Sequence, residues 1–127
     1  MKKFFGLGLA MLAGIAIGAG GLSVLNAQNA GAGYYISELF EITDQPTFQT
    51  YVQQVPGTVA KYGGKYVVRG GKTQANEGEP PARIIVITFK TMADAQKWYG
   101  SPEYAAIKPI RQKSARSRTY IVEGLPE

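Results

Sequence analysis

Apolar residues recur in short runs along the chain, and these runs predict four strands. From Tyr34 to Ile42 every second residue is apolar except Glu38, which is the pattern of a strand with one apolar face. The other runs cover 65–69, 84–89 and 119–122. The run 84–89 is apolar on both faces, so we expect both sides of that strand to be covered.

The segment between the first two strands has the period of a helix. Apolar residues recur at helical spacing from Phe48 to Tyr62 and form one face. Asp44 is the expected N-cap, and Gly63-Gly64 marks the exit. Pro56 lacks a backbone donor, so we expect it to kink or split this helix.

A second helical region follows the third strand. Thr91 with Asp94 three residues later resembles a capping box, and Gly100 ends this helix. Ser101 and Pro102 are typical of the N-cap and first position of a further helix. The second region is therefore expected as a helix in two pieces.

This order of elements predicts an α+β domain of the ferredoxin-like βαββαβ type. Its helices would cover one face of a four-stranded antiparallel sheet and leave the other face bare. Because the run 84–89 is apolar on both sides, we expect a second copy of the chain to cover that face. The sequence thus predicts a homodimer.

The N-terminal segment has the layout of a secretory signal peptide. Lys2 and Lys3 precede the uncharged apolar run 4–19, and Ala30-Gly31-Ala32 fits an A-x-A cleavage site. We therefore expect a signal peptide over 1–32 and a folded domain over 33–127, located in the periplasm or secreted. The alternative is an uncleaved N-terminal anchor in the inner membrane, since no charge occurs between Lys3 and Glu38.

Composition narrows the chemistry. The 127 residues include no cysteine and no histidine. This excludes disulfides, thiol nucleophiles, Cys/His zinc sites, a histidine haem ligand and histidine acid–base catalysis, and no metal or cofactor is expected. Without Lys2 and Lys3 of the predicted leader, the chain has twelve basic and nine acidic residues, which gives a net charge of +3. Nucleic acid is not an expected partner, and membrane contact is expected only through an uncleaved leader.

Several short motifs follow one another in the predicted domain: Lys61-Tyr62-Gly63-Gly64-Lys65-Tyr66, Val68-Arg69-Gly70-Gly71, Glu77-Gly78, Trp98-Tyr99 and Ser101-Pro102-Glu103-Tyr104. With these motifs, the region from about 35 to 124 resembles the domain-of-unknown-function 1330 (DUF1330) family. The resemblance implies a dimeric α/β barrel, in which two ferredoxin-like sheets face one another. It implies no function, although the wider superfamily is similar in fold to cofactor-independent monooxygenases and muconolactone isomerases.

The turn after the second strand is a candidate anion site. Gly70 and Gly71 would let backbone N–H groups form a nest, with Arg69 and Lys72 adding positive charge. The alternative is a tight turn that needs glycine for a positive φ, flanked by solvated cations.

Aromatic residues around the break between the two helical pieces are a candidate ligand wall. Trp98 and Tyr104 would stack on a planar ligand, or they would serve core or dimer packing. Arg111 follows Tyr104 by seven residues on the same helix face and would point into such a pocket. The other cations of the run 108–118 are expected on a solvated helix face or against an anionic partner.

Two further residues have a possible chemical role. Glu38 interrupts an apolar strand face, so it is either a buried general acid or base, or a carboxylate turned to solvent or paired with Arg69 or Arg83. Ser101 has no histidine to activate it and is expected to cap a helix.

Three functions follow from these readings. The first is an exported homodimer that binds a small anionic or aromatic molecule through Arg69, Gly70, Gly71, Trp98, Tyr104 and Arg111. The second is a cofactor-independent isomerase or monooxygenase acting on a planar organic acid, with Glu38 as base and Arg69 as carboxylate clamp. The third is a structural envelope protein whose dimer interface is its whole role.

Overall fold

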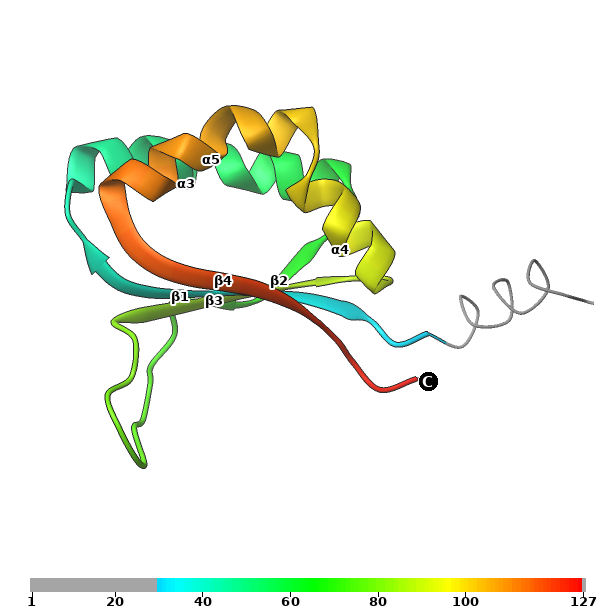
Figure 1. Ribbon diagram of the computed structural model, residues 1–127, viewed down its shortest axis with the longest axis horizontal. Coiled ribbons are helices and arrows are strands. Elements are labelled where there is room, and N and C mark those ends of the chain that lie inside the picture. Colours follow the sequence, from blue (N-terminus) through cyan, green and yellow to red (C-terminus); the bar gives the residue numbers. More distant parts are fainter. Residues whose placement is uncertain (1–29, 127) are drawn as a thin grey trace, which may run out of the picture. The chain divides into compact units, whose positions relative to one another are not determined.

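The computed structural model describes residues 30–126, in which a four-stranded antiparallel sheet carries three helices on one face (Figure 1). The elements are β1 (Gly33–Ile42), α3 (Gln45–Lys61), β2 (Lys65–Arg69), β3 (Arg83–Phe89), α4 (Met92–Tyr99), α5 (Pro102–Ser114) and β4 (Ala115–Glu123). The strand order β2-β3-β1-β4 is that of the ferredoxin-like arrangement. The predicted fold class is confirmed.

The predicted leader falls mainly on residues 1–29, which lie outside the described residues. Between residues 30 and 126, no helix is long and apolar enough to cross a membrane.

Local signals place the start and end of α3. Oδ1 of Asp44 accepts a hydrogen bond from the backbone N of Thr47 at 3.2 Å, and Gly63 ends the turn beyond the helix with φ of +79°. The expected split of this helix at Pro56 is wrong, because α3 continues through Pro56 to Lys61. The buried face on both sides of Pro56 includes Val55 and Val59, and this packing outweighs one missing backbone hydrogen bond.

The second helical region is divided as expected. Oγ of Ser101 accepts from the N of Tyr104 at 3.1 Å and donates to the carbonyl of Trp98 at 2.7 Å, so it caps α5 and joins it to α4. The chain passes from α5 into β4 at Ala115 without a loop. The expectation of one basic helix face over 108–118 is therefore wrong for Arg116 and Arg118, which lie in the strand.

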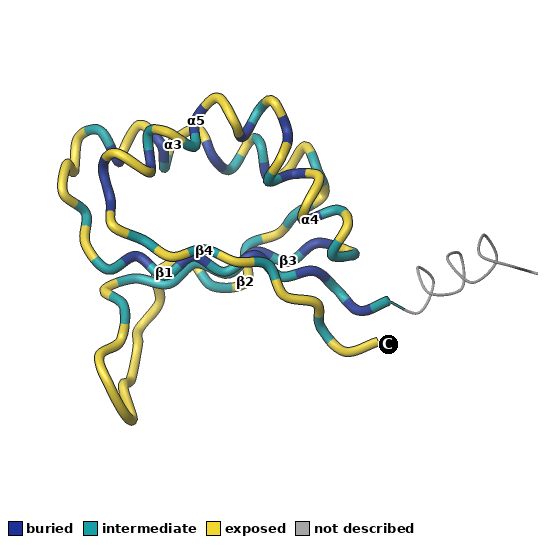
Figure 2. Tube along the Cα trace, viewed as in Figure 1, coloured by how far each residue is buried: buried dark blue, intermediate teal, exposed yellow. Residues whose placement is uncertain are grey.

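The two faces of the sheet differ in what covers them. Tyr35, Ser37 and Leu39 of β1 point toward the helices and are buried. Dark, buried segments alternate with less buried ones along the sheet in Figure 2. They join a core that includes Phe48, Tyr51, Val59, Ile87, Phe89, Trp98 and Tyr104. The alternate residues, among them Ile36, are only half-buried because no helix of the described chain covers them.

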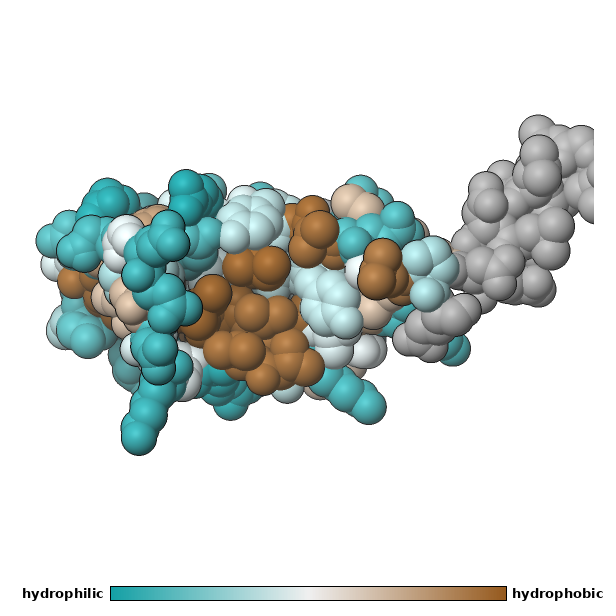
Figure 3. Space-filling view, turned by 90° about the horizontal axis from the view of Figure 1, so that it is seen from below, coloured by the Kyte–Doolittle hydropathy of each residue, from teal (hydrophilic) through white to brown (hydrophobic). Residues whose placement is uncertain are grey.

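An apolar patch occupies the uncovered face of the sheet (Figure 3). By strand alternation it includes Ile36 of β1, Ile84 and Val86 of β3, and Val122 of β4. Val122 is 46% exposed, and the other three side chains are half-buried. This is the face expected to meet a second copy.

Candidate functional site

A β-bulge in β2 turns two side chains toward the same face. Tyr66 pairs with Ile87 and Arg69 with Ile85, so both face the helices although three positions separate them in the sequence. Val67 is the additional residue that makes this possible. Cζ of Arg69 lies 3.7 Å from the centroid of the Tyr66 ring, where cation–π attraction holds the guanidinium.

A cavity of about 80 Å³ lies between this face of the sheet and α3. Its apolar lining comes from both layers and includes Leu39, Ile85, Phe48 and Val55. At roughly 15 Å³ per water molecule, it has room for about five waters or for a small organic molecule.

Arg111 of α5 is buried against the cavity with only 5% of its surface exposed. Its Nε donates to Oη of Tyr104 at 3.3 Å and its Nη1 to Oγ of Ser117 at 2.8 Å. Within residues 30–126, every ion pair joins other residues, so no carboxylate neutralises this guanidinium. A buried cation held by hydroxyls alone leaves unused capacity for an anion.

Tyrosine hydroxyls add hydrogen-bond donors around Arg111. The Oη atoms of Tyr51 and Tyr104 lie 2.7 Å apart. Because Tyr104 accepts from Arg111, its own proton can go to Tyr51, which leaves the proton of Tyr51 for the cavity. Oη of Tyr35 is buried and has no hydrogen-bond partner among the described residues.

Tyr35 and Tyr51 stay protonated at neutral pH in the folded protein, because the pKa of each hydroxyl is raised. Burial raises the pKa of Tyr35 well above its usual value, and the nearby Tyr104 adds to the effect. Burial likewise raises the pKa of Tyr51. Burial works against the charge on Arg111, but the neighbouring oxygens of Tyr35 and Tyr104 outweigh it, so the pKa of Arg111 rises. The buried end of the cavity therefore presents donors and positive charge.

The glycine turn contributes indirectly through Arg83. Arg83 lines the cavity, and its buried Nε has no hydrogen-bond partner within residues 30–126. Gly70 has φ of +68°, and a Cβ placed on it would lie 2.6 Å from that Nε. Gly70 thus makes room for Arg83. Gly71 is exposed, and neither glycine is in the cavity lining.

Trp98 lies behind the wall of the cavity. It is fully buried, with ring centroids 4.9 Å from Tyr35 and 4.4 Å from Tyr104, and it donates to Thr58 at 3.0 Å. Neither Trp98 nor Tyr104 is in the cavity lining. Their position suits holding Tyr35 and Arg111 in place rather than stacking on a ligand.

Glu38 lies on the opposite side of the sheet. Its carboxylate accepts from Nη2 of Arg118 at 2.9 Å and from the hydroxyl of Tyr120. The bond from Arg118, and after it the bond from Tyr120, lowers the pKa of Glu38. The expected pairing with Arg69 or Arg83 is wrong, because the sheet separates them. For the same reason Glu38 and Arg69 cannot act together as base and clamp.

Sequence reasoning missed several residues of this cavity: Tyr35, Ser37, Tyr51 and the cavity-facing position of Arg83. The alternation of β1 contained a usable signal, since Tyr35, Ser37 and Leu39 form the face opposite to the one interrupted by Glu38. No sequence pattern placed Arg83 in the cavity, because its distance from Arg69 depends on how β2 and β3 pair.

The lining determines what the cavity can do. Its titratable side chains are arginines and tyrosines, which donate hydrogen bonds at neutral pH. The lining contains no carboxylate to accept a proton from a ligand. No group of three acidic side chains within residues 30–126 is placed to hold a metal ion. The arrangement is suited to binding an anion.

Solved structures share this fold. The protein of unknown function RPA0582 from Rhodopseudomonas palustris matches with a TM-score of 0.62 and 16% identity over 82% of this chain and 92% of that one. Its methylated form gives 0.63 and 15% over 82% and 90%. SnoaB, a cofactor-independent oxygenase from Streptomyces nogalater, gives 0.55 and 7% over 75% and 94%. At these identities the likeness concerns the fold alone.

The sequence comparison is more specific. No curated protein matches the chain. A family model does match, and it covers residues 32–125, nearly all of the part that the structure describes. The chain therefore belongs to the family described as domain of unknown function DUF1330.

Proposed function

We propose that this domain binds a small organic carboxylate in the cavity between the sheet and α3. The observation that carries the proposal is Arg111, a buried guanidinium that hydroxyls surround and that no carboxylate of the described chain neutralises. A carboxylate would accept from Nη2 of Arg111, which is not used in the bonds to Tyr104 and Ser117, and from Oη of Tyr35, which is buried without a partner among residues 30–126. Both groups would then be satisfied.

The apolar lining favours an organic anion over an inorganic one. Leu39, Phe48 and Val55 surround the space beside the donors. A carboxylate with a hydrocarbon part gains roughly 25 cal/mol for each Å² of apolar surface that it buries there. Sulfate or phosphate would leave these side chains facing water.

Calorimetric titration of the domain with acetate, butyrate, succinate and benzoate tests the proposal. We expect saturable binding by the wild-type protein and by Arg116→Met, a matched control whose guanidinium lies on the far face of the sheet. Arg111→Met should bind about 10- to 100-fold more weakly, the size of a lost charge-assisted hydrogen bond. Absence of binding by the wild-type protein, or equal binding by Arg111→Met, would overturn the proposal.

We infer that the protein acts as a homodimer whose sheets face one another. The apolar patch of Ile36, Ile84, Val86 and Val122 supports this, because a patch left in water on a soluble domain is typical of an association surface. The cavity lies on the other side of the sheet. Each copy would therefore hold its own ligand.

We also propose that the domain works outside the cytoplasm. The proposal rests on the two leading lysines, the apolar run after them and the small residues at 30–32. A periplasmic or secreted protein of this kind would meet carboxylates from the surroundings of the cell.

A further inference from the structure

The cations of the cavity are held in two separate places. Nη1 of Arg111 donates to Ser117, which fixes this guanidinium over β4. Arg69 stacks on Tyr66 of β2. β2 is an edge strand of the sheet, and the side chain of Arg83 extends toward it, since its Nε lies close to Gly70 at the end of β2. One basic group therefore lies over β4 and the other over the β2 edge.

The strand register separates the two groups. Arg83 pairs with Leu39, and Leu39 pairs with Ser117, so two strand spacings of about 4.8 Å each, roughly 10 Å, lie between Arg83 and the anchor of Arg111. Arg69 lies one strand farther away. The side chains of Arg69 and Arg83 are held near the β2 edge of the sheet. One carboxylate therefore cannot contact this pair and Arg111 at the same time.

The surface between the two groups is mainly apolar. Leu39 and Ile85 form the floor there, with the hydroxyl of Ser37 between β3 and β4, and Val55 lies in the wall from α3. A ligand that reaches both groups would lay a hydrocarbon chain on this floor. The donors at the ends match carboxylates in geometry as well as in charge.

We propose that the ligand is a dicarboxylate with a short hydrocarbon chain, an inference that rests on the proposed function of the same cavity. One carboxylate binds at the buried end, to Arg111 and the hydroxyl of Tyr35. The other binds at the rim, to the guanidinium groups of Arg83 and Arg69, both of which line the cavity. Two negative charges also offset more of the three positive charges of the lining than one would.

A chain-length series tests this inference by calorimetry. The probes are the α,ω-dicarboxylates from malonate to suberate, each compared with the monocarboxylate of equal carbon number. We expect affinity to peak at one dicarboxylate length. At that length the dicarboxylate should bind at least about tenfold more tightly than the monocarboxylate, the effect of a second charge-assisted contact.

Variants at the rim separate the two ends. Arg69→Met and Arg83→Met should bring the best dicarboxylate down to the affinity of the monocarboxylate and leave the monocarboxylate nearly unchanged. Arg111→Met should weaken both probes. Lys72→Met, which removes an exposed cation of the neighbouring loop, is the matched control and should change neither.

The outcomes distinguish this inference from the proposed function. If each dicarboxylate binds no better than its monocarboxylate, the dicarboxylate inference is overturned while carboxylate binding stands. If Arg69→Met and Arg83→Met weaken both kinds of probe equally, the two arginines only attract anions by their charge and do not bind a second carboxylate. The inference is then also overturned. If no probe binds the wild-type protein, both proposals fail.

Discussion

Arg111 is buried although no carboxylate of the described chain pairs with it. Burial of its charge therefore lowers the stability of the folded state. Moving a charged group from water into the protein costs several kcal/mol, and the hydroxyls of Tyr104 and Ser117 return only part of this. An anion bound beside Arg111 would offset this cost, as the proposed function requires.

The stability of Arg111→Met without ligand follows from this cost. We expect its free energy of unfolding in urea to lie within about 1 kcal/mol of the wild-type value or above it, since methionine fills the space without a charge. Tyr104 keeps its hydrogen bond to Tyr51 in this variant. A loss of about 3 kcal/mol or more would instead show that Arg111 serves mainly to hold the fold together.

Gly70 supports a prediction of its own. Gly70→Ala meets both a positive φ and Nε of Arg83, whereas Gly63→Ala meets a positive φ of +79° with open space around it. Both variants should lose about 1 kcal/mol of stability. Only Gly70→Ala should also weaken binding of the best dicarboxylate, because it displaces Arg83. Equal affinities of the two variants in calorimetry would contradict this role of Gly70.

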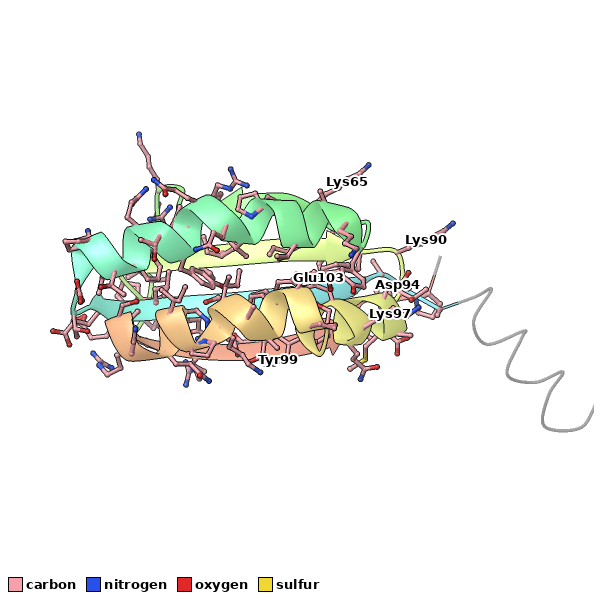
Figure 4. All side chains as sticks on the ribbon, turned by 90° about the horizontal axis from the view of Figure 1, so that it is seen from above. Lys65, Lys90, Asp94, Lys97, Tyr99 and Glu103 are labelled. Atoms are coloured by element: carbon pink, nitrogen blue, oxygen red, sulfur yellow. The ribbon has the colours of Figure 1, made fainter. Side chains whose placement is uncertain are left out.

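At the scale of elements, α3 and α5 pack side by side over the sheet (Figure 4). A polar cluster joins the C-terminal end of α3 to the first turn of α5. Glu103, in the first turn of α5, forms an ion pair with Lys61 of α3 and accepts from the hydroxyl of Tyr62 at 2.7 Å. Lys61, and after it Tyr62, lowers the pKa of Glu103 to about 2. The charged form of Glu103 therefore stabilises the folded state.

This link predicts a dependence of stability on pH. Because the pKa of Glu103 is lower in the folded chain than its usual 4.5, its contribution is full above about pH 4.5 and is lost as pH falls toward 2. Urea unfolding should show a difference between wild type and Glu103→Gln that shrinks over this range. Glu79→Gln, in the exposed loop after β2, controls for one lost charge. A difference independent of pH would refute the link.

The elements themselves were largely predictable, and their register was not. Asp44, Thr91 and Ser101 marked helix starts because a cap depends only on neighbouring residues. Arg69 and Arg111 were singled out as ligand-binding residues, and both line the cavity. Arg83 was not, because its place beside Arg69 depends on a bulge and a hairpin register that join residues far apart in the chain.

At the scale of the whole molecule, the sheet lies between the cavity and the apolar patch. Val86, in the apolar patch, tests the proposed pairing: Val86→Lys should shift sedimentation from dimer to monomer, since it places a charge in the contact. Ala106→Lys, on the exposed side of α5, should leave the dimer intact. A wild-type protein that sediments as a monomer at high concentration would contradict the pairing.

The proposed export is also testable on the full chain. Expressed in a Gram-negative bacterium, the protein should appear in the periplasmic fraction with an N-terminus starting between residues 28 and 33. Replacement of Lys2 and Lys3 by Glu should retain it in the cytoplasm. A full-length chain in the membrane fraction would favour the anchor instead.

The additional residue in β2 has a consequence for related proteins. Without Val67, Tyr66 and Arg69 would be two positions apart, and regular pairing would still keep both side chains on the face toward the helices. A relative that keeps the three-residue spacing but pairs this strand regularly would direct the arginine to the opposite face of the sheet. The bulge together with the spacing, and not the presence of the arginine alone, should therefore separate the relatives that bind the same class of molecule from those that do not.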